Sequence, residues 1–496
     1  MDASSSANSE ASEIEFKLEI EAAGAERLRA HFIPDDSAQS KQQVTIYYDT
    51  PDATLRDHGF TLRVRKVGDG FVQTIKPLTT VTGLISRAEY ETDVSSLDPN
   101  LKALSGTPLG QLAKSGKLSG LQPTTQSDVR RTSWVIEAGG SRIQADLDEG
   151  KLRAGGRSQR FNELELELLS GDPACLLRAT KDIAERVPVR LGVLTKAERG
   201  TLLAAGAFKK VAKAARVEVQ PGMSIAEVFE IVVHACLRHY RLNETLAIAS
   251  RKKEALHQAR VALRRLRSAF TLFRPVTADV EYQYLRQELR WFTAQLGEAR
   301  NLDVFLEREL PDDERDVLTA RREQAYDHVL AAMDSQRFRL LLIELVGWTA
   351  LGPWRRGKRA ARPIEHYAST RLDRLWSSIG HNGRHIAELD EETRHHLRIQ
   401  VKKMRYALDF LRGLYPESIS AKSFGVAVED LQESLGKLND LATARTLGAP
   451  PRAEQSWLIG SPDEKPLIRE AERAFRDLDD VGPFWRHPHR ADHVHA

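Results

Sequence analysis

Polar and apolar residues alternate along the first third of the chain. EIEFKLEI (13–20), TLRVRKV (61–67) and NELELELL (162–169) show this alternation, which is typical of strands that bury one face. GDG at 68–70 and AGGS at 138–141 separate neighbouring segments and are typical of hairpin turns. Many strands joined by short turns predict an antiparallel sheet or barrel.

From Ser224 onward the apolar positions recur with a period of 3.6, as in amphipathic helices. The expected fold class is therefore α+β, with a β-rich region at 13–208, a linker at 209–223 and an all-α bundle at 224–450. We expect residues 1–12 to form a disordered arm. We expect residues 451–496, which end in HPHRADHVHA, to form a partly ordered extension.

The helical region contains an internal repeat. LHQARVALRRLRSAFTLF (256–273) matches RHHLRIQVKKMRYALDFL (394–411) at an offset of 138 residues. LGEARNLD (296–303) matches LGKLNDLA (435–442) at an offset of 139 residues. Two agreeing offsets predict a duplicated, pseudo-two-fold bundle with repeats at about 224–350 and 360–450.

Each of the two long matched segments carries a basic stripe beside an apolar one. A single basic stripe is usually a solvated face, but two stripes brought together by the duplication would repel each other without an anionic partner. The candidate anion-binding residues are His257, Arg260, Arg264, Arg265 and Arg267 in the first copy and His395, Arg398, Lys402, Lys403 and Arg405 in the second.

Composition narrows the possible functions only slightly. The 496 residues have a net charge of +3 and two cysteines, which suggest neither a disulfide framework nor a thiolate metal site. The first residues lack the order of a signal peptide, and the most apolar window, LLLIELVGW (340–348), is too short to span a bilayer. We expect a soluble, cytoplasmic protein without a membrane partner. The chain lacks a GxxxxGK[ST] phosphate loop.

Several strand-like segments carry charges of mainly one sign on one face. The acidic sets are Glu89 with Glu91, Asp146 with Asp148, and Glu163 with Glu165 and Glu167, and a basic set is Arg63 with Arg65. For any single strand, a solvated outer face is the ordinary explanation. Together, these sets favour a polar lumen in which carboxylates bind a hard divalent cation and basic groups bind phosphate oxygens. Phosphoryl transfer is the chemistry that needs this pair.

The N-terminal region resembles the CYTH family, the triphosphate tunnel metalloenzymes. The resemblance covers about residues 10–208 and rests on EIEFK as an ExExK motif, followed in order by YYDTPDATL, LRVRK, QTIKP, RAEYE, DLDEG, ELELEL and LTKAERG. It implies an N-terminal antiparallel eight-stranded β-tunnel that hydrolyses triphosphate-bearing substrates with Mg²⁺ or Mn²⁺.

The resemblance also implies roles for the matched residues. Those expected to hold metal are Glu13, Glu15, Asp148, Glu163, Glu165 and Glu167. Those expected to bind phosphate are Lys17, Arg63, Arg65, Lys76, Arg131 and Lys196. Those expected to act in catalysis are Lys17, Glu89, Glu91 and Glu167, with Glu167 as our choice of proton acceptor. The family often has a basic residue where this chain has Val129, which leaves substrate choice and rate open.

The helical region resembles the CHAD family, conserved-histidine α-helical domains that accompany CYTH domains. The match spans about residues 217–450, with HxxRVxxRRLR in the first copy and HxxRxxxKKxRY in the second. It implies that the stripe residues bind inorganic polyphosphate in a basic groove.

We therefore expect a metal-dependent inorganic triphosphatase with a polyphosphate-binding helical domain. One alternative is a non-catalytic protein that binds polyphosphate or targets its granules. Another is a triphosphatase that acts on thiamine triphosphate or a nucleotide. Nucleic acid is not an expected partner, because the stripes contain no aromatic stacking residue. The oligomeric state stays open.

Overall fold

The computed structural model describes residues 11–34, 36–78, 84–307, 309–415, 418–446 and 464–486. Most of the predicted N-terminal arm and the histidine-rich C-terminal end lie outside these ranges, and the first strand begins at Ala11. Contacts divide the chain into two compact units. The first comprises Met1–Lys213, Leu237–Ala259 and His328–Gly352, and the second comprises the remaining segments.

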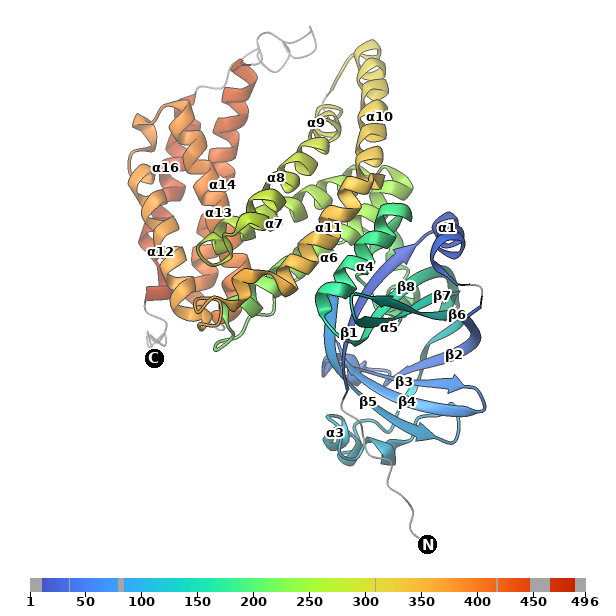
Figure 1. The fold of residues 1–496 in the computed structure, drawn as a ribbon. Helices are drawn as coiled ribbons and strands as arrows, with labels where there is room; N and C mark the ends of the chain where they lie inside the picture. Colours follow the sequence, from blue (N-terminus) through green and yellow to red (C-terminus); the bar gives the residue numbers. More distant parts are fainter. Residues whose placement is uncertain are drawn as a thin grey trace. The chain divides into compact units, whose positions relative to one another are not determined.

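The strands of the first unit form one antiparallel sheet that closes into a ring (Figure 1). The strand order is β5-β4-β3-β2-β6-β7-β8-β1-β9, and a further pairing of β5 with β1 closes the first eight strands. The predicted eight-stranded antiparallel tunnel is thus confirmed. The strands are β1 (Ala11–Ile20), β2 (Gln39–Asp49), β3 (Phe60–Val67), β4 (Gly70–Pro77), β5 (Leu84–Val94), β6 (Gln122–Ala138), β7 (Ser141–Ala154), β8 (Arg157–Ser170) and the short β9 (Val189–Leu191).

The β6–β7 turn shows how the sequence sets this topology. Gly139 and Gly140 have φ values of +57° and +76°, a region that glycine adopts readily and that two-residue hairpin turns require. Ala138 and Ser141 are register partners across the turn. The AGGS segment therefore forms the hairpin that its sequence predicts.

Both faces of β1 and β8 are buried, which explains their alternation of charge and leucine. Leu164 and Leu166 are fully buried on one face, and β8 contacts helix α4 (Pro173–Arg186). On the other face, Glu163 is 0% exposed and Lys17 is 5% exposed. The charged face is therefore the interior of the ring, where charges must pair with one another.

Helix α5 (Lys196–Ala204) packs against β6, β7 and β8. A capping box fixes its start, because the Thr195 hydroxyl accepts from the Glu198 backbone N–H and the Glu198 carboxylate accepts from the Thr195 backbone N–H. This cap places Lys196 at the first helical position, beside the ring. The other helices of this region are α1 (Ala22–Phe32), α2 (Thr54–Asp57) and α3 (Gly110–Lys114).

The rest of the described chain is helical, as predicted (Figure 1). The helices are α6 (Ile225–Ser250), α7 (Lys253–Thr277), α8 (Val280–Gln295), α9 (Gly297–Phe305), α10 (Asp312–Asp334), α11 (Gln336–Leu351), α12 (Ile364–Gly383), α13 (Glu391–Leu411), α14 (Ile419–Thr446) and α16 (Glu464–Val481). Helix α16, in the predicted extension, packs against α14. None of the helices in the described ranges has the length and apolar content needed to cross a membrane.

The repeated sequences adopt related but unequal structures. The long matched segments form α7 and α13. The short ones differ, because LGEARNLD begins at the junction of α8 and α9, whereas LGKLNDLA lies inside the continuous helix α14. One copy therefore breaks a helix that the other keeps whole.

Candidate active site and basic groove

The ring encloses a cavity of about 250 Å³ to which all eight strands contribute lining residues. Charged groups dominate the lining, and their signs balance. The cations are Lys17, Arg63, Arg65, Lys76, Arg131 and Lys196, and the carboxylates are Glu15, Glu89, Glu91, Asp146, Glu165 and Glu167.

Lys196 is the centre of an ion-pair network on one wall. Its Nζ lies 2.8 Å from Glu163, 2.9 Å from Asp148 and 3.1 Å from Glu165. Burial alone would lower the pKa of Lys196, but these three carboxylates raise it well above its usual value. Lys196 therefore keeps its charge in the interior.

Lys17 shares two of these carboxylates. Its Nζ lies 3.2 Å from Glu163 and 3.1 Å from Glu165. Burial favours a lower pKa for Lys17, yet Glu163 and Glu165 raise it above the usual value. For Glu165, burial would raise the pKa, but Lys196, Lys17 and Arg131 hold it well below the usual carboxyl range. The carboxylate is therefore ionised at neutral pH.

Arg131 of β6 joins the remaining acidic groups of this wall. Its Nε donates to Asp148 at 2.6 Å, its Nη1 to Asp146 at 2.7 Å and its Nη2 to Glu165 at 2.7 Å. Burial opposes the charge of Arg131, but these carboxylates raise its pKa well above the usual value. Such charge-assisted bonds fix the guanidinium in one orientation.

The opposite wall, from β3, β4 and β5, is richer in positive charge. Lys76 forms an ion pair with Glu89, and Arg63 Nη2 lies 3.9 Å from the same carboxylate. Arg65 has no ion pair within the described ranges, and its Nε donates to the Thr45 hydroxyl at 3.3 Å. Burial, Arg63 and Arg131 lower its pKa to about 10. This wall can accept an anion that the other wall cannot.

Most of the residues predicted from the sequence for the tunnel line the cavity. Asp148 and Glu163 do not line it and instead lie buried behind Lys196. The side chain of Glu13 lies outside the described residues. Asp146 and Tyr47 line the cavity without a predicted role. The alternation of Asp146 with Asp148 in DLDEG was the signal for the first, and the second is the first residue of the YYDTPDATL motif, which carried no assigned role.

The Val129 position has an apolar surrounding. Val129 is 3% exposed and packs in a cluster with Leu152, Phe161 and Leu203 of α5. Its neighbour Arg130 points to the outer face, where it pairs with Glu149 at 2.9 Å. A basic side chain at 129 would therefore meet the apolar contact between the sheet and α5.

No group of three or more His, Cys, Asp or Glu side chains in the described part of the chain is arranged to hold a metal ion. Glu165 and Asp146 instead form ion pairs with lysines and arginines. Glu15 and Glu167 are directly opposed in the β1–β8 register, and both line the cavity. Like charges placed opposite each other destabilise a sheet, so a cation between them would be favourable.

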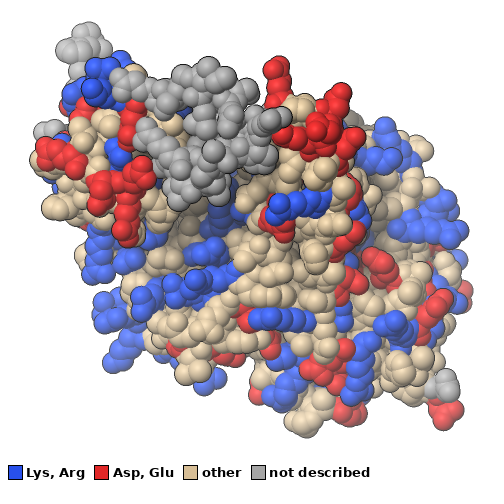
Figure 2. Space-filling model, turned by 90° about the horizontal axis from the view of Figure 1, so that it is seen from above, with Lys and Arg blue, Asp and Glu red and all other residues tan. Residues whose placement is uncertain are grey.

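A second cavity, of about 300 Å³, lies in the helical unit and is named here the basic groove. The two repeated helices meet there, with Arg264 and Arg267 from α7 and Lys402 and Lys403 from α13. Its lining is completed by Ser268, Phe270, Thr271, Arg286, Leu289, Arg290, Ile399 and Tyr406. Seen from above, a band of Lys and Arg side chains crosses the helical part of the molecule (Figure 2).

Burial and electrostatic repulsion between cations lower the pKa of arginines in and beside the basic groove. Burial and the nearby Arg290 and Arg286 lower the pKa of Arg267. Just beyond the groove on α7, burial, Arg264 and Arg300 lower the pKa of Arg260 to about 10. Among the described residues, no carboxylate forms an ion pair with Arg264, Arg267, Arg286 or Arg290. Sequence reasoning missed Arg286 and Arg290, because α8 lies outside the long repeat.

The other predicted stripe residues lie apart from this cavity. Arg265 is buried and pairs with Asp409 at 2.8 Å, and Arg405 lies 3.7 Å from Glu429. His395 Nδ1 lies 2.6 Å from the Asn439 side-chain oxygen. His257 and Arg398 do not line the groove. The two aromatic side chains of the groove, Phe270 and Tyr406, are buried, so they present no open stacking surface.

Comparison with known proteins gives two domain matches. A family model described as CYTH domain matches residues 11–201, and one described as CHAD domain matches residues 231–449. An inorganic triphosphatase from Haemophilus influenzae is 33% identical over 165 residues, which make up 33% of this chain and 46% of that protein. The chain thus spans about half the length of that relative.

Two solved structures resemble parts of this chain. The crystal structure of the CHAD domain from the plant Ricinus communis covers 55% of this chain and 92% of its own, with 27% identity and a TM-score of 0.43. A protein from Hippeastrum, described as a candidate adenylyl cyclase with a dominant triphosphatase activity, covers 39% of this chain and 96% of its own. Its identity is 16% and its TM-score 0.30.

Proposed function

Because residues 11–201 form a CYTH domain and residues 231–449 form a CHAD domain, we propose that this protein hydrolyses inorganic triphosphate in its tunnel and binds polyphosphate in its basic groove. The products of the tunnel reaction are pyrophosphate and phosphate. The observation that carries the first half is the convergence of six cations, from β1, β3, β4, β6 and α5, on one cavity. The name of the Haemophilus influenzae relative supports the same activity.

The size and polarity of the cavity favour an inorganic substrate. Pockets for drug-sized organic ligands usually enclose about 300–1,000 Å³ and are mostly apolar. The tunnel cavity is about 250 Å³, and charged side chains make up most of its lining. A short chain of phosphates matches both properties better than a nucleotide does.

Arg63, Arg65 and Lys76 form the wall that receives the phosphates. Arg65 is the first of these to engage an anion, since it has no carboxylate partner among the described residues. Arginine suits this role because its planar fork binds two phosphate oxygens at once. Glu89 pairs with Lys76 and lies near Arg63, so it orients both cations toward the cavity.

The lumen residues fit a divalent cation that arrives with the substrate. Mg²⁺ is usually held by one or two carboxylates plus substrate phosphates, and Glu15 and Glu167 are two opposed carboxylates on the cavity wall. We assign them to Mg²⁺ or Mn²⁺, with Glu13 two residues before Glu15 on the same strand. When bound, the ion would neutralise charge on the phosphates and lower the pKa of a bound water.

The remaining carboxylates keep the cations in place. Glu163 and Asp148 hold Lys196, and Glu165 joins Lys196, Lys17 and Arg131. Thr74 donates to Glu91 at 2.9 Å, which orients that carboxylate at the cavity wall. Glu167 remains our choice for the group that takes the proton of the attacking water.

The second half of the proposal rests on the basic groove. Burial and neighbouring cations lower the pKa of Arg267, which means that the charge of Arg267 is costly without a counter-anion. A linear polyanion would relieve several of these repulsions at once. Polyphosphate is such an anion, and it needs no aromatic stacking surface.

Two variants separate the two halves of the proposal. Glu165→Ala should abolish phosphate release from tripolyphosphate with Mg²⁺ or Mn²⁺ and leave polyphosphate binding intact. Arg264→Ala combined with Lys402→Ala should do the reverse. Glu149→Ala is the matched control for the first variant, because Glu149 pairs with Arg29 and Arg130 away from the cavity.

Parallel assays on pyrophosphate, ATP and thiamine triphosphate identify the preferred substrate. Faster release from ATP or thiamine triphosphate than from tripolyphosphate would overturn the assignment to inorganic triphosphate. Polyphosphate binding without any phosphate release would favour the non-catalytic alternative.

A further inference from the structure

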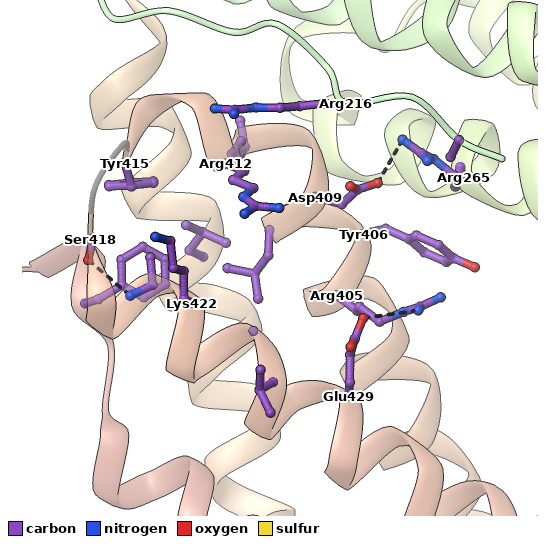
Figure 3. Close-up of a pocket in the computed structure, with 18 of the residues that line it drawn as sticks. Arg216, Arg265, Arg405, Tyr406, Asp409, Arg412, Tyr415, Ser418, Lys422 and Glu429 are labelled. Carbon is purple, nitrogen blue, oxygen red and sulfur yellow. Dashed lines mark hydrogen bonds and ion pairs between the residues drawn. The ribbon is translucent and has the colours of Figure 1, made fainter.

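The helical unit contains another, larger cavity of about 680 Å³, which we call the α13–α14 pocket (Figure 3). Its walls come mainly from α13 and α14. Its larger apolar lining residues are Val261, Leu372, Leu408, Leu411, Val426 and Phe484. It shares only Tyr406 with the lining of the basic groove. The two cavities are therefore separate sites.

Positive charge gathers at one end of this pocket. In Figure 3, Arg216 and Arg412 lie in the upper part of the view and Lys422 lies at the left. No ion pair of these three side chains is recorded among the residues that the structure describes. All three side chains are exposed, so an anion from solution can reach them and accept their hydrogen bonds.

The carboxylates of the pocket do not compensate these cations. Asp409 pairs with Arg265 at 2.8 Å, and Glu429 lies 3.7 Å from Arg405. Both pairs lie on the other side of the cavity in Figure 3. The cationic end thus keeps an excess of three positive charges, from Arg216, Arg412 and Lys422.

One side chain of the apolar wall is exposed to solvent, whereas Leu372 and Leu411 are buried behind the surface. Val426 of α14 is 58% exposed and belongs to the lining. An exposed apolar side chain that adjoins a hollow with further apolar lining can contact an apolar ligand. The volume of about 680 Å³ falls within the usual range for sites of small organic ligands.

We propose that the α13–α14 pocket binds a small amphiphilic phosphate, a molecule with an apolar body of one or two rings and a phosphate group. The body lies against Leu408, Leu411 and Val426, and the phosphate receives hydrogen bonds from Arg412 and Lys422. Polyphosphate does not fit this description, because it would leave the apolar wall uncovered. The site is therefore additional to both the tunnel and the basic groove.

Isothermal titration of the full-length protein tests the proposal with 1-naphthyl phosphate as the probe. Two comparison compounds each lack half of the recognised chemistry, namely 1-naphthol and inorganic phosphate. We expect both to bind at least about tenfold more weakly than the probe, since each loses either the charged contacts or the apolar contacts.

Two sets of variants locate the binding. Arg412→Ala with Lys422→Ala should weaken probe binding by at least about tenfold. Val426→Glu should do the same, because it places a carboxylate on the apolar wall. Since Val426 is exposed, this substitution should leave the protein folded, and a loss of probe binding would not be due to unfolding. Lys358→Ala with Arg362→Ala, at two exposed positions outside the pocket, is the matched control and should bind normally.

Three results would overturn the proposal. Inorganic phosphate binding as tightly as the probe would show a simple anion site. Unchanged probe binding in the pocket variants would show that the probe binds elsewhere. Loss of probe binding in the Arg264→Ala, Lys402→Ala protein would place it in the basic groove. None of these results bears on phosphate release in the tunnel, so failure here is distinguishable from failure of the proposed function.

Discussion

Replacing Lys196 by methionine should open the tunnel locally and stop catalysis. Lys196 is 7% exposed, and its Nζ contacts Glu163, Asp148 and Glu165 at 2.8, 2.9 and 3.1 Å. Methionine keeps the length and apolar stem of the side chain but removes its charge. The buried carboxylates of Asp148 and Glu163 and the half-buried one of Glu165 then lose a shared cation, and their mutual repulsion remains.

The size of the effect follows from the contacts that survive. Removing one partner of a buried ion pair costs about 3–5 kcal/mol. In this variant Lys17 still contacts Glu163 and Glu165, and Arg131 still contacts Asp148. We therefore expect the lower end of the range, about 3 kcal/mol. Since about 1.4 kcal/mol is a factor of ten, the locally open population should rise by about 10²-fold.

Hydrogen exchange followed by mass spectrometry measures this population directly. Peptides from β7 and β8 should exchange about 10²-fold faster in Lys196→Met than in the wild type. Lys66→Met is the matched control, because Lys66 is exposed on β3 and outside the cavity lining. An increase of less than about tenfold in β7 and β8 would refute the account of Lys196 as the centre of the network.

Two further predictions concern pH and salt. Burial would raise the pKa of Glu165, but Lys196, Lys17 and Arg131 lower it well below the usual value, so its stabilising effect is complete above about pH 4.5 and is lost on further acidification. The melting temperature of the tunnel should fall as the pH drops below that value, and it should fall less in Glu165→Gln. An equal fall in melting temperature in both proteins would contradict this. In the basic groove, Arg286→Ala with Arg290→Ala should weaken polyphosphate binding and reduce its dependence on salt. Titration at several NaCl concentrations measures both effects, and the control Gln287→Ala on the same helix should change neither.

The sequence was a good guide to which side chains face the lumen, because alternation fixes the face of a strand. It could not show how deep each side chain lies or which partner it meets. Asp148 and Glu163 were predicted as metal ligands, yet both lie behind Lys196, which α5 brings to the ring. That approach depends on how α5 packs against β6, β7 and β8, which no strand pattern contains.

In the helical region, too, the sequence predicted some of the groove residues and missed others. The repeat identified α7 and α13, and these helices do meet in one cavity. Arg265 was included because the motif contains it, but at about 100° per residue it points away from Arg264 and Arg267, and the structure pairs it with Asp409. Helix geometry alone would therefore have excluded Arg265 from the stripe that contains Arg264 and Arg267. Arg290 could not be found in this way, since only tertiary packing brings α8 to the groove.

The balance of charge in the tunnel has a consequence for the proposed reaction. Six cations and six carboxylates line the cavity, so the lining alone is close to neutral. Apart from Arg65, which has no carboxylate partner among the described residues, the tunnel cations must give up contacts to carboxylates when they bind a triphosphate, and each carboxylate so released, Glu165 among them, becomes available to a divalent ion. Substrate and metal should therefore each raise the affinity for the other by the same factor, because such coupling is reciprocal. The ion pairs of the tunnel thus favour the joint binding of substrate and metal over the binding of either one alone.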